Sequence, residues 1–300
     1  MAERPLPRDV VGGAHVDYLV RPMEDREELR RMLAPYRHYA AYALGQLQPE
    51  LFARSEWWLA RGATGEALLL HSRGGLGSAL FVLGAVDGIE ALLRLHPGPR
   101  HTFLTCQVHH LETVARQYLL VEQHSMLRML VDRETFRPAS GTVSRLKGNQ
   151  VRQMNSLYRS EGPPAFYSAQ NIDEAVYYAA FAGDRIVAVA GTHVEAPDDA
   201  IAVAGNVFTH PAYRGQGLGR LVTGAVTEHL LKSHREVVLS VDPRNEPAVA
   251  AYRRLGFREV SRLIEGAAVR RDLGLMAIVR RRVAALRGRR YGAELVSVRG

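Results

Sequence analysis

The sequence predicts an α/β fold built in two halves, and three observations support this prediction. Short strand-like runs alternate with amphipathic helical segments along most of the chain. A polar stretch at 132–150, with a proline and two glycines, interrupts the periodic pattern and divides the chain. The length of 300 residues is enough for two domains, each with its own hydrophobic core.

The first half begins with helical patterns and continues as strands alternating with helices. The apolar spacing predicts its helices at 24–34, 35–47, 87–96 and 109–120, with Pro35 separating the first two. Its strands are expected at 66–72, 78–86, 101–108 and 125–132. The glycine-rich stretch at 72–78 precedes a strand, so we interpret it as a turn rather than a ligand loop.

The second half has a similar order of elements. Residues 149–160 predict a helix, and 175–194 predict two strands joined by a Gly-Asp turn. A strand at 200–210, a helix at 218–232, a strand at 236–242, a helix at 246–256 and one or two strands at 257–271 follow. Both halves therefore place a helix before their strands, which is compatible with an old duplication.

Composition excludes several classes of protein. No charge-free stretch reaches the roughly 17 residues that a membrane span needs, and the N-terminus lacks the apolar core of a secretory signal. The single cysteine, Cys106, lies in a strand-like run, so we expect a buried, inert thiol in a cytoplasmic protein.

The chain is basic, with a net charge of +8 that comes from 37 arginines and only two lysines. The densest cluster, 280–290, follows apolar residues at helical spacing, which favours a solvated helix face over a contact with a polyanion. No helix-turn-helix, zinc-finger or aromatic RNA-binding motif is present, so we regard nucleic-acid binding as a remote alternative. The histidines lack carboxylates or cysteines at ligand spacing, and we expect no metal.

The stretch "RGQGLGR" at 214–220 is the strongest local signal in the sequence. It follows a strand and enters a helix whose apolar residues fall on one face. A helix N-terminus offers unpaired N–H groups and partial positive charge, and glycines allow close approach and positive φ angles. Neither the dinucleotide fingerprint nor the Walker lysine motif is present. The pattern predicts a site for a phosphate or pyrophosphate.

The spacing R-x-x-G-x-G, from Arg214 to Gly219, resembles the pyrophosphate loop of the GNAT superfamily of acyl-CoA-dependent N-acyltransferases. A second signature follows at 245–257, "NEPAVAAYRRLGF", with an asparagine, a tyrosine seven residues later and a closing Leu-Gly-Phe. The resemblance covers roughly residues 141–272. It implies a GNAT fold with a mixed, mostly antiparallel, splayed central sheet, and acetyl-CoA as acyl donor.

The resemblance also implies a role for each matching residue. Strand residues Val207, Phe208 and Thr209 would lie along the pantetheine arm, and Asn245 would flank it on the other side. Tyr252 would direct its hydroxyl at the thioester sulfur. The pyrophosphate would be held by the loop residues Arg214, Gly215, Gln216, Gly217, Leu218, Gly219 and Arg220.

Each of these roles has a structural alternative. Asn245 is a good helix N-cap with Pro247 close behind, Tyr252 fits a core aromatic position, and Arg214 fits a surface charge. Many family members carry a glutamate on the strand before the glycine loop, and this chain has no carboxylate there. The proton acceptor is therefore open between Glu195, His193 and a water held by Asn206, with the water route favoured.

We therefore expect an N-acetyltransferase that transfers an acetyl group to a primary amine in a ternary complex. The alternative is an acyl-CoA-binding regulatory module without turnover. Three parts are expected: an N-terminal α/β domain at 1–140 on the acceptor side, a catalytic domain at 141–272 and a basic extension at 273–300. The two-part layout resembles the branch that includes the glycine N-acyltransferase-like proteins, and the first half lacks both cofactor signatures.

Overall fold

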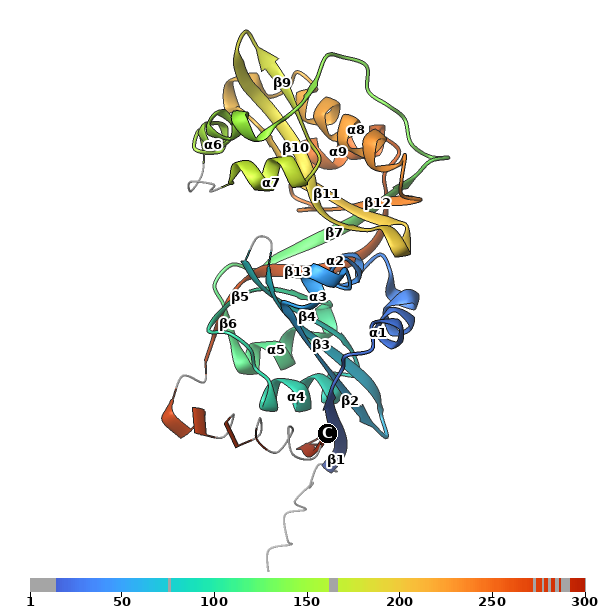
Figure 1. Cartoon of the computed structure of the whole chain (residues 1–300), viewed down its shortest axis with the longest axis vertical. Coiled ribbons are helices and arrows are strands. Elements are labelled where there is room, and N and C mark those ends of the chain that lie inside the picture. The colour runs from blue at the N-terminus through green and yellow to red at the C-terminus, as the bar shows by residue number, and fades with distance from the viewer. Residues whose placement is uncertain are drawn as a thin grey trace, which may run out of the picture.

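The computed structural model describes residues 15–74, 77–161 and 167–271, together with 274–276, 278–279, 282–283, 286 and 292–299 of the C-terminal part. Two lobes lie one above the other along the long axis, joined at a narrow waist (Figure 1). One continuous sheet runs through both lobes. Among the described residues, no helix has the length and apolar character that a bilayer span requires. The basic cluster expected at 280–290 lies largely outside the described residues.

The first half supplies most of the lower lobe. Its strands are β1 (His15–Pro22), β2 (Ser55–Gly62), β3 (Gly65–Gly74), β4 (Gly77–Gly84), β5 (His101–Cys106), β6 (Tyr118–Leu120) and β7 (His124–Asp132). Its helices are α1 (Arg26–Leu33), α2 (Ala41–Gly45), α3 (Pro49–Phe52), α4 (Val86–Leu95) and α5 (Leu111–Gln117). Strand β4 runs parallel to β5, whereas β1, β2, β3 and β4 are antiparallel neighbours.

The second half supplies most of the upper lobe. Its strands are β8 (Ser144–Arg145), β9 (Tyr177–Ala182), β10 (Arg185–Ala196), β11 (Ile201–Thr209), β12 (Glu236–Val241), β13 (Arg258–Arg270) and β14 (Glu294–Arg299). Its helices are α6 (Val151–Tyr158), α7 (Ala169–Glu174), α8 (Leu218–Leu230) and α9 (Glu246–Arg254). Here β11 runs parallel to β12, and β14 returns to pair antiparallel with β1 of the first half.

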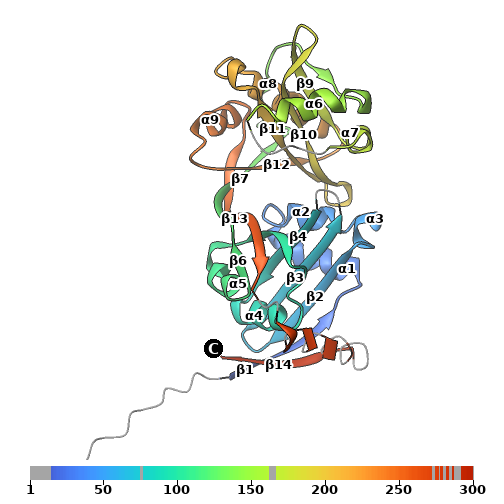
Figure 2. The same ribbon diagram turned by 90° about the vertical axis from the view of Figure 1, so that its left-hand side faces the viewer.

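The two halves exchange strands at the waist. The order of the sheet is β14-β1-β2-β3-β4-β5-β13-β7-β12-β11-β10-β9-β8. Strand β7, from the first half, therefore pairs with β12 of the second. Strand β13, from the second half, pairs with β5 of the first. The exchanged strands also pair with each other, and both pass through the waist between the lobes (Figure 2).

Helix α2 packs between the lobes and is the centre of a shared hydrophobic core. Its residues Ala43 and Leu44 belong to one buried cluster. The same cluster includes Leu70 of β3, Val194 of β10 and Val203 of β11. A Cβ added to Gly45 would overlap a methyl group of Val194, so the helix contacts β10 closely. Three further clusters lie under α4 and α5, under α8 and α9, and under α6 and α7.

The GNAT fold expected from the sequence is confirmed, with a mixed sheet whose described pairings are parallel only at β4–β5 and β11–β12. Two helix predictions need correction. Residues 118–120 form strand β6 on β13, because Tyr118 is buried with its hydroxyl donating to the Pro97 carbonyl. The segment 35–47 contains a 3₁₀ turn at Ala34–Tyr36 before the short α2. Strands β1, β2, β8 and β14 and helices α3 and α7 were not predicted.

Candidate functional site

The sheet opens at the parallel pair β11–β12. Their register covers only Ile201–Val203 against Glu236–Val238, after which the two strands diverge. Beyond this point the backbone groups that face the partner strand have no ladder to join, so they are available to a ligand. Residues 204–207 on one side and Leu239 and Ser240 on the other line a cavity. The splay implied for the family is therefore present, and Val207 borders it.

The connection from β11 to α8 is the glycine loop. Gly215 and Gly217 have φ angles of 78° and 76°, which only glycine adopts without strain, and a Cβ at either would meet no atom within 4 Å. The left-handed backbone therefore explains why glycine occupies positions 215 and 217, and the space in front of both residues is open. Gly217 is also the N-cap of α8, so the N–H groups of the first helical turn have no partner within the helix.

The charges around this loop are not equivalent. Arg214 pairs with Glu161 through both terminal nitrogens, and its Nε donates to the Thr209 carbonyl at 3.2 Å. The guanidinium lies 5.9 Å from the centre of the Phe208 ring. Arg220 has no hydrogen-bonding or ion-pairing partner among the described residues, which leaves its charge available to an anion. Gln216 is exposed, and Leu218 packs against the core under α8.

Helix α9 carries the second signature. Asn245 is its N-cap, and the side-chain oxygen accepts the Ala248 N–H at 3.2 Å, so the capping alternative describes this geometry. Tyr252 lies seven residues later, is 6% exposed and lines the cavity at the splay. Burial raises the pKa of its phenol to about 12, so the hydroxyl keeps its proton at neutral pH.

Two adjacent bulges bring His193 and Asn206 together. On β11, two residues separate Gly205 from Phe208 where the partner strand has one between Val189 and Gly191, and Asn206 takes a left-handed φ of 52° that asparagine tolerates. On β10, His193 is the extra residue between Thr192 and Val194. The His193 Nε2 lies 2.7 Å from the Asn206 Oδ1.

A chain of hydrogen bonds fixes the histidine tautomer. The Asn206 amide nitrogen donates to the Tyr177 hydroxyl at 2.9 Å, so its oxygen accepts from His193 Nε2–H. The other ring nitrogen, Nδ1, then carries a lone pair and accepts from the hydroxyl of Tyr42 on α2. Burial lowers the pKa of His193, and the nearby Arg128 charge lowers it further, so the imidazole is neutral. A proton acceptor held in one orientation is thus built from both halves.

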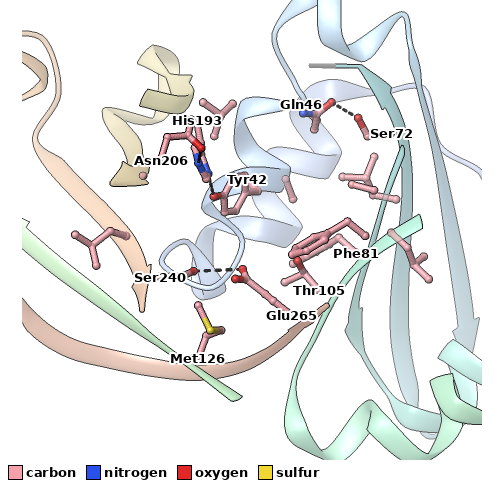
Figure 3. A pocket seen from close by; sticks show the side chains of 18 of the residues that line it. Tyr42, Gln46, Ser72, Phe81, Thr105, Met126, His193, Asn206, Ser240 and Glu265 are labelled. Atoms are coloured by element: carbon pink, nitrogen blue, oxygen red, sulfur yellow. Dashed lines mark hydrogen bonds between the residues drawn. The ribbon is translucent and has the colours of Figure 1, made fainter. Parts of the chain in front are cut away.

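The cavity itself has a volume of about 540 Å³ and lies between the two halves. Figure 3 shows Tyr42, His193 and Asn206 gathered at one part of it, with Ser240 and Glu265 forming another pair. The Ser240 hydroxyl donates to the Glu265 carboxylate at 3.3 Å. Behind this wall lies Arg128, fully buried, with one terminal nitrogen 3.5 Å from a Glu265 oxygen.

Of the three candidate proton acceptors, the structure brings His193 and Asn206 into the cavity and leaves Glu195 outside it. The Glu195 carboxylate lies 3.6 Å from His234, and Glu195 is not part of the cavity lining. Cys106 is buried, and burial raises the pKa of its thiol to about 12, in agreement with an inert cysteine.

Sequence reasoning missed Tyr42, Arg128 and Glu265. A signal existed for two of them, because Arg128 and Glu265 are single charges inside the apolar runs 126–131 and 263–269, where charged residues are rare unless paired. Tyr42 carried no signal, since an aromatic residue in an alanine-rich helix fits a core position equally well. The role of Tyr42 depends on the position of α2 against strands β10 and β11.

Comparison with known proteins agrees with this geometry. Residues 148–257 match the model of the acetyltransferase (GNAT) family. The matched stretch runs from the start of α6 to the end of the second signature and includes the glycine loop, Asn206 and Tyr252. This part of the chain is therefore similar to a GNAT acetyltransferase domain. No curated protein sequence matches the chain.

Solved structures share the fold over both halves. A Drosophila protein superposes with a TM-score of 0.61 at 11% identity, covering 83% of this chain and 98% of that one. A GCN5-related N-acetyltransferase from Sphaerobacter thermophilus gives 0.52 at 14% identity, with 86% and 98% covered. A GCN5-related N-acetyltransferase-like protein from Streptococcus suis gives 0.53 at 12% identity, with 82% and 100% covered. At these identities the likeness concerns the fold.

Proposed function

We propose that this chain, whose residues 148–257 are similar to a GNAT acetyltransferase domain, is an N-acetyltransferase that moves the acetyl group of acetyl-CoA to a primary amine. The observation that carries the proposal is the position of Tyr252 in a cavity that begins where β11 and β12 diverge. The glycine loop opens from the end of the same β11 strand. Donor and acceptor would meet at this point in a ternary complex, and the amine would attack the thioester directly.

The donor site follows from unpaired backbone groups. The first turn of α8 and the loop amides at 215–220 would hold the pyrophosphate, with Arg220 as the available charge. Val207, Phe208 and Thr209 would lie along the pantetheine, and Asn245 would flank it while it continues to cap α9. Arg214 would contribute only by giving up its pairing with Glu161.

The proton path follows from the hydrogen-bond chain. An attacking amine must lose a proton, and Tyr42 would receive it while its own hydrogen passes to His193 Nδ1, the nitrogen to which its hydroxyl already donates. Asn206 holds the imidazole in this tautomer. As the C–N bond forms and the C–S bond breaks, the Tyr252 hydroxyl would donate its proton to the departing sulfur. This route replaces the glutamate that strand β11 lacks, and it is preferred over a water held by Asn206 alone.

The first half serves the acceptor in this proposal. It would form the acceptor wall of the cavity and contribute Tyr42, and it would bind no donor. The three-part division at 140 and 272 remains a proposal about sequence segments, since the exchanged strands cross it. The two-part layout of the chain supports the resemblance to the branch that includes the glycine N-acyltransferase-like proteins. This resemblance does not identify the acceptor.

The test combines binding and turnover. Calorimetry with acetyl-CoA should give one site per chain, and release of free thiol should depend on an added primary amine, with the acetylated amine identified by mass spectrometry. Binding of acetyl-CoA without thiol release for any amine would contradict the proposal and favour a regulatory acyl-CoA-binding module.

A further inference from the structure

The cavity has a large apolar wall that acetyl transfer itself does not use. The first half lines it with the apolar side chains of Leu51, Leu70, Phe81, Phe103 and Met126. The Phe81 ring is held against Tyr39, with ring centres 4.9 Å apart. Phe103 lines the same cavity and is 50% exposed, which places it where the cavity meets solvent. This wall is suited to an apolar body of the acceptor.

Polar groups on this wall are few and already partly paired. The Ser72 hydroxyl donates to the Gln46 side-chain oxygen at 2.7 Å. Besides this pair, Ser78 and Thr105 are the polar side chains that the first half adds to the wall among the described lining residues, apart from Tyr42. An acceptor rich in hydroxyl or amino groups would bury many of them here without partners, which costs free energy.

Only one lining residue is charged. Among the described residues of the cavity wall, Glu265 carries the sole full charge, because His193 is neutral. Glu265 as a whole residue is 8% exposed. Among the described residues, its carboxylate accepts a single hydrogen bond, from the Ser240 hydroxyl at 3.3 Å. Free lone pairs therefore remain for a donor that enters the cavity.

Arg128 connects the carboxylate of Glu265 to Tyr42. It is fully buried, its guanidinium makes no hydrogen bond within the described residues, and its nearest carboxylate oxygen is 3.5 Å away on Glu265. The guanidinium carbon also lies 5.2 Å from the centre of the Tyr42 ring. Glu265 and Tyr42 thus border the same cation, so the carboxylate and the proton-accepting hydroxyl lie near one corner of the cavity.

We infer that the acceptor is a primary amine with one positive charge and an apolar aryl or alkyl body. Its ammonium group enters beside Glu265, next to Tyr42, and its body lies against Phe81 and Phe103. A second ammonium group would meet apolar side chains, and an acceptor carboxylate would meet Glu265. This inference rests on the proposed acetyltransferase function and specifies its substrate class.

The first test is a panel of acceptors with the full-length chain and acetyl-CoA. The panel contains 2-phenylethylamine, hexylamine, spermidine, kanamycin and glycine, and thiol release gives kcat/KM for each. We expect the first two to exceed the other three by at least 100-fold. Acetylation of spermidine, kanamycin or glycine with the higher kcat/KM overturns the substrate class and leaves the proposed function intact. Absence of turnover with every amine, despite donor binding, overturns the proposed function and with it this inference.

The second test changes the wall. Phe103→Ala should lower kcat/KM for 2-phenylethylamine about tenfold more than it lowers kcat/KM for ethylamine, since ethylamine has no ring to lose contact. Phe181→Ala is the matched control, because Phe181 is a partly exposed phenylalanine on β9 outside the cavity. Equal effects of Phe103→Ala on both amines would overturn the assignment of this wall.

The third test changes the charge. Glu265→Gln should raise the KM for 2-phenylethylamine at least tenfold, with the dissociation constant of acetyl-CoA unchanged within twofold. An unchanged KM in a variant that binds acetyl-CoA normally overturns the role of Glu265. Since Glu265→Gln leaves Arg128 without its carboxylate, the Phe103 variants keep the proposal testable if this one does not fold.

Discussion

The two halves of the chain share an architecture and differ in one connection. In both, a strand runs parallel to the next strand and is followed by a helix, as β4–α4–β5 in the first half and β11–α8–β12 in the second. A single residue, Ala85, joins β4 to α4, whereas residues 210–217 join β11 to α8. The longer loop holds both left-handed glycines in front of a helix N-terminus.

The halves also differ at their second helix. Helix α9 begins with a side-chain cap from Asn245 and carries Tyr252 seven residues later. Helix α5 has His110 at its N-cap position without a side-chain hydrogen bond, and the residue seven positions on is Gln117. The comparison teaches that the layers can persist while the residues that we propose for donor binding lie in one loop and one helix. In our proposal the first half keeps the scaffold and contributes Tyr42 in place of a donor site.

The largest expected effect comes from removing the Tyr252 hydroxyl. Tyr252→Phe keeps the buried ring and should lower kcat about 10²-fold, the lower range for general acid catalysis. The dissociation constant of acetyl-CoA and the melting temperature should barely change. Steady-state kinetics with the best acceptor of the panel measures kcat. Calorimetry measures the dissociation constant and the melting temperature.

A tyrosine of the first half is the matched control for this variant. Tyr118→Phe removes a buried hydroxyl that donates to the Pro97 carbonyl. It should lower the free energy of unfolding by about 1 kcal/mol and leave kcat unchanged. Equal kcat values for wild type and Tyr252→Phe would make Tyr252 a packing residue. A loss of donor affinity together with kcat would make its role structural.

The glycine loop offers the next largest effect. Gly217→Glu places a carboxylate at the predicted pyrophosphate position and strains a left-handed backbone. Acetyl-CoA should bind at least tenfold more weakly, about 1.4 kcal/mol, as calorimetry would measure. Ala85→Glu makes the corresponding change before α4 in the first half and should leave the affinity unaltered. If both variants bind equally well, the pyrophosphate assignment is wrong.

Tyr42 tests whether the first half takes part in the chemistry or only forms a wall. Tyr42→Phe removes the hydrogen bond to His193 Nδ1 and should lower kcat about fivefold, equivalent to about 1 kcal/mol. The donor dissociation constant should stay constant, because Tyr42 lies on the acceptor side. A kcat within experimental error of wild type would return the proton path to a water held by Asn206.

The pH dependence of kcat should be the smallest effect. The His193 pKa is lowered below its usual value near 6.5, so protonation removes the acceptor only at lower pH. Tyr252 loses its proton only near its pKa of about 12. Between pH 7 and 10, kcat should therefore show no decline. A decline with a midpoint near 10, the value for free tyrosine, would indicate that Tyr252 is solvated in the complex.

Much of the second half could be predicted from the sequence because its motifs are local. The glycine loop, the Asn245 cap and the Tyr252 helix each depend on residues within one strand–helix unit, and the helix and strand periodicities placed them correctly. His193 and Asn206 could each be named as candidates from the sequence. Their hydrogen bond could not be predicted, since it depends on two bulges that shift the register of β10 against β11. Tyr42, Arg128 and Glu265 depend on contacts between segments more than 80 residues apart.

The strand exchange at the waist makes the chain one cooperative unit. Removal of the first half would strip β7 from β12 and leave an open edge, and loss of the second would do the same to β5 by removing β13. Such bare edges favour aggregation over independent folding. A mutation that unfolds either lobe is therefore expected to unfold the other. The first half is therefore expected to be needed for the fold of the second, whether or not it takes part in the chemistry.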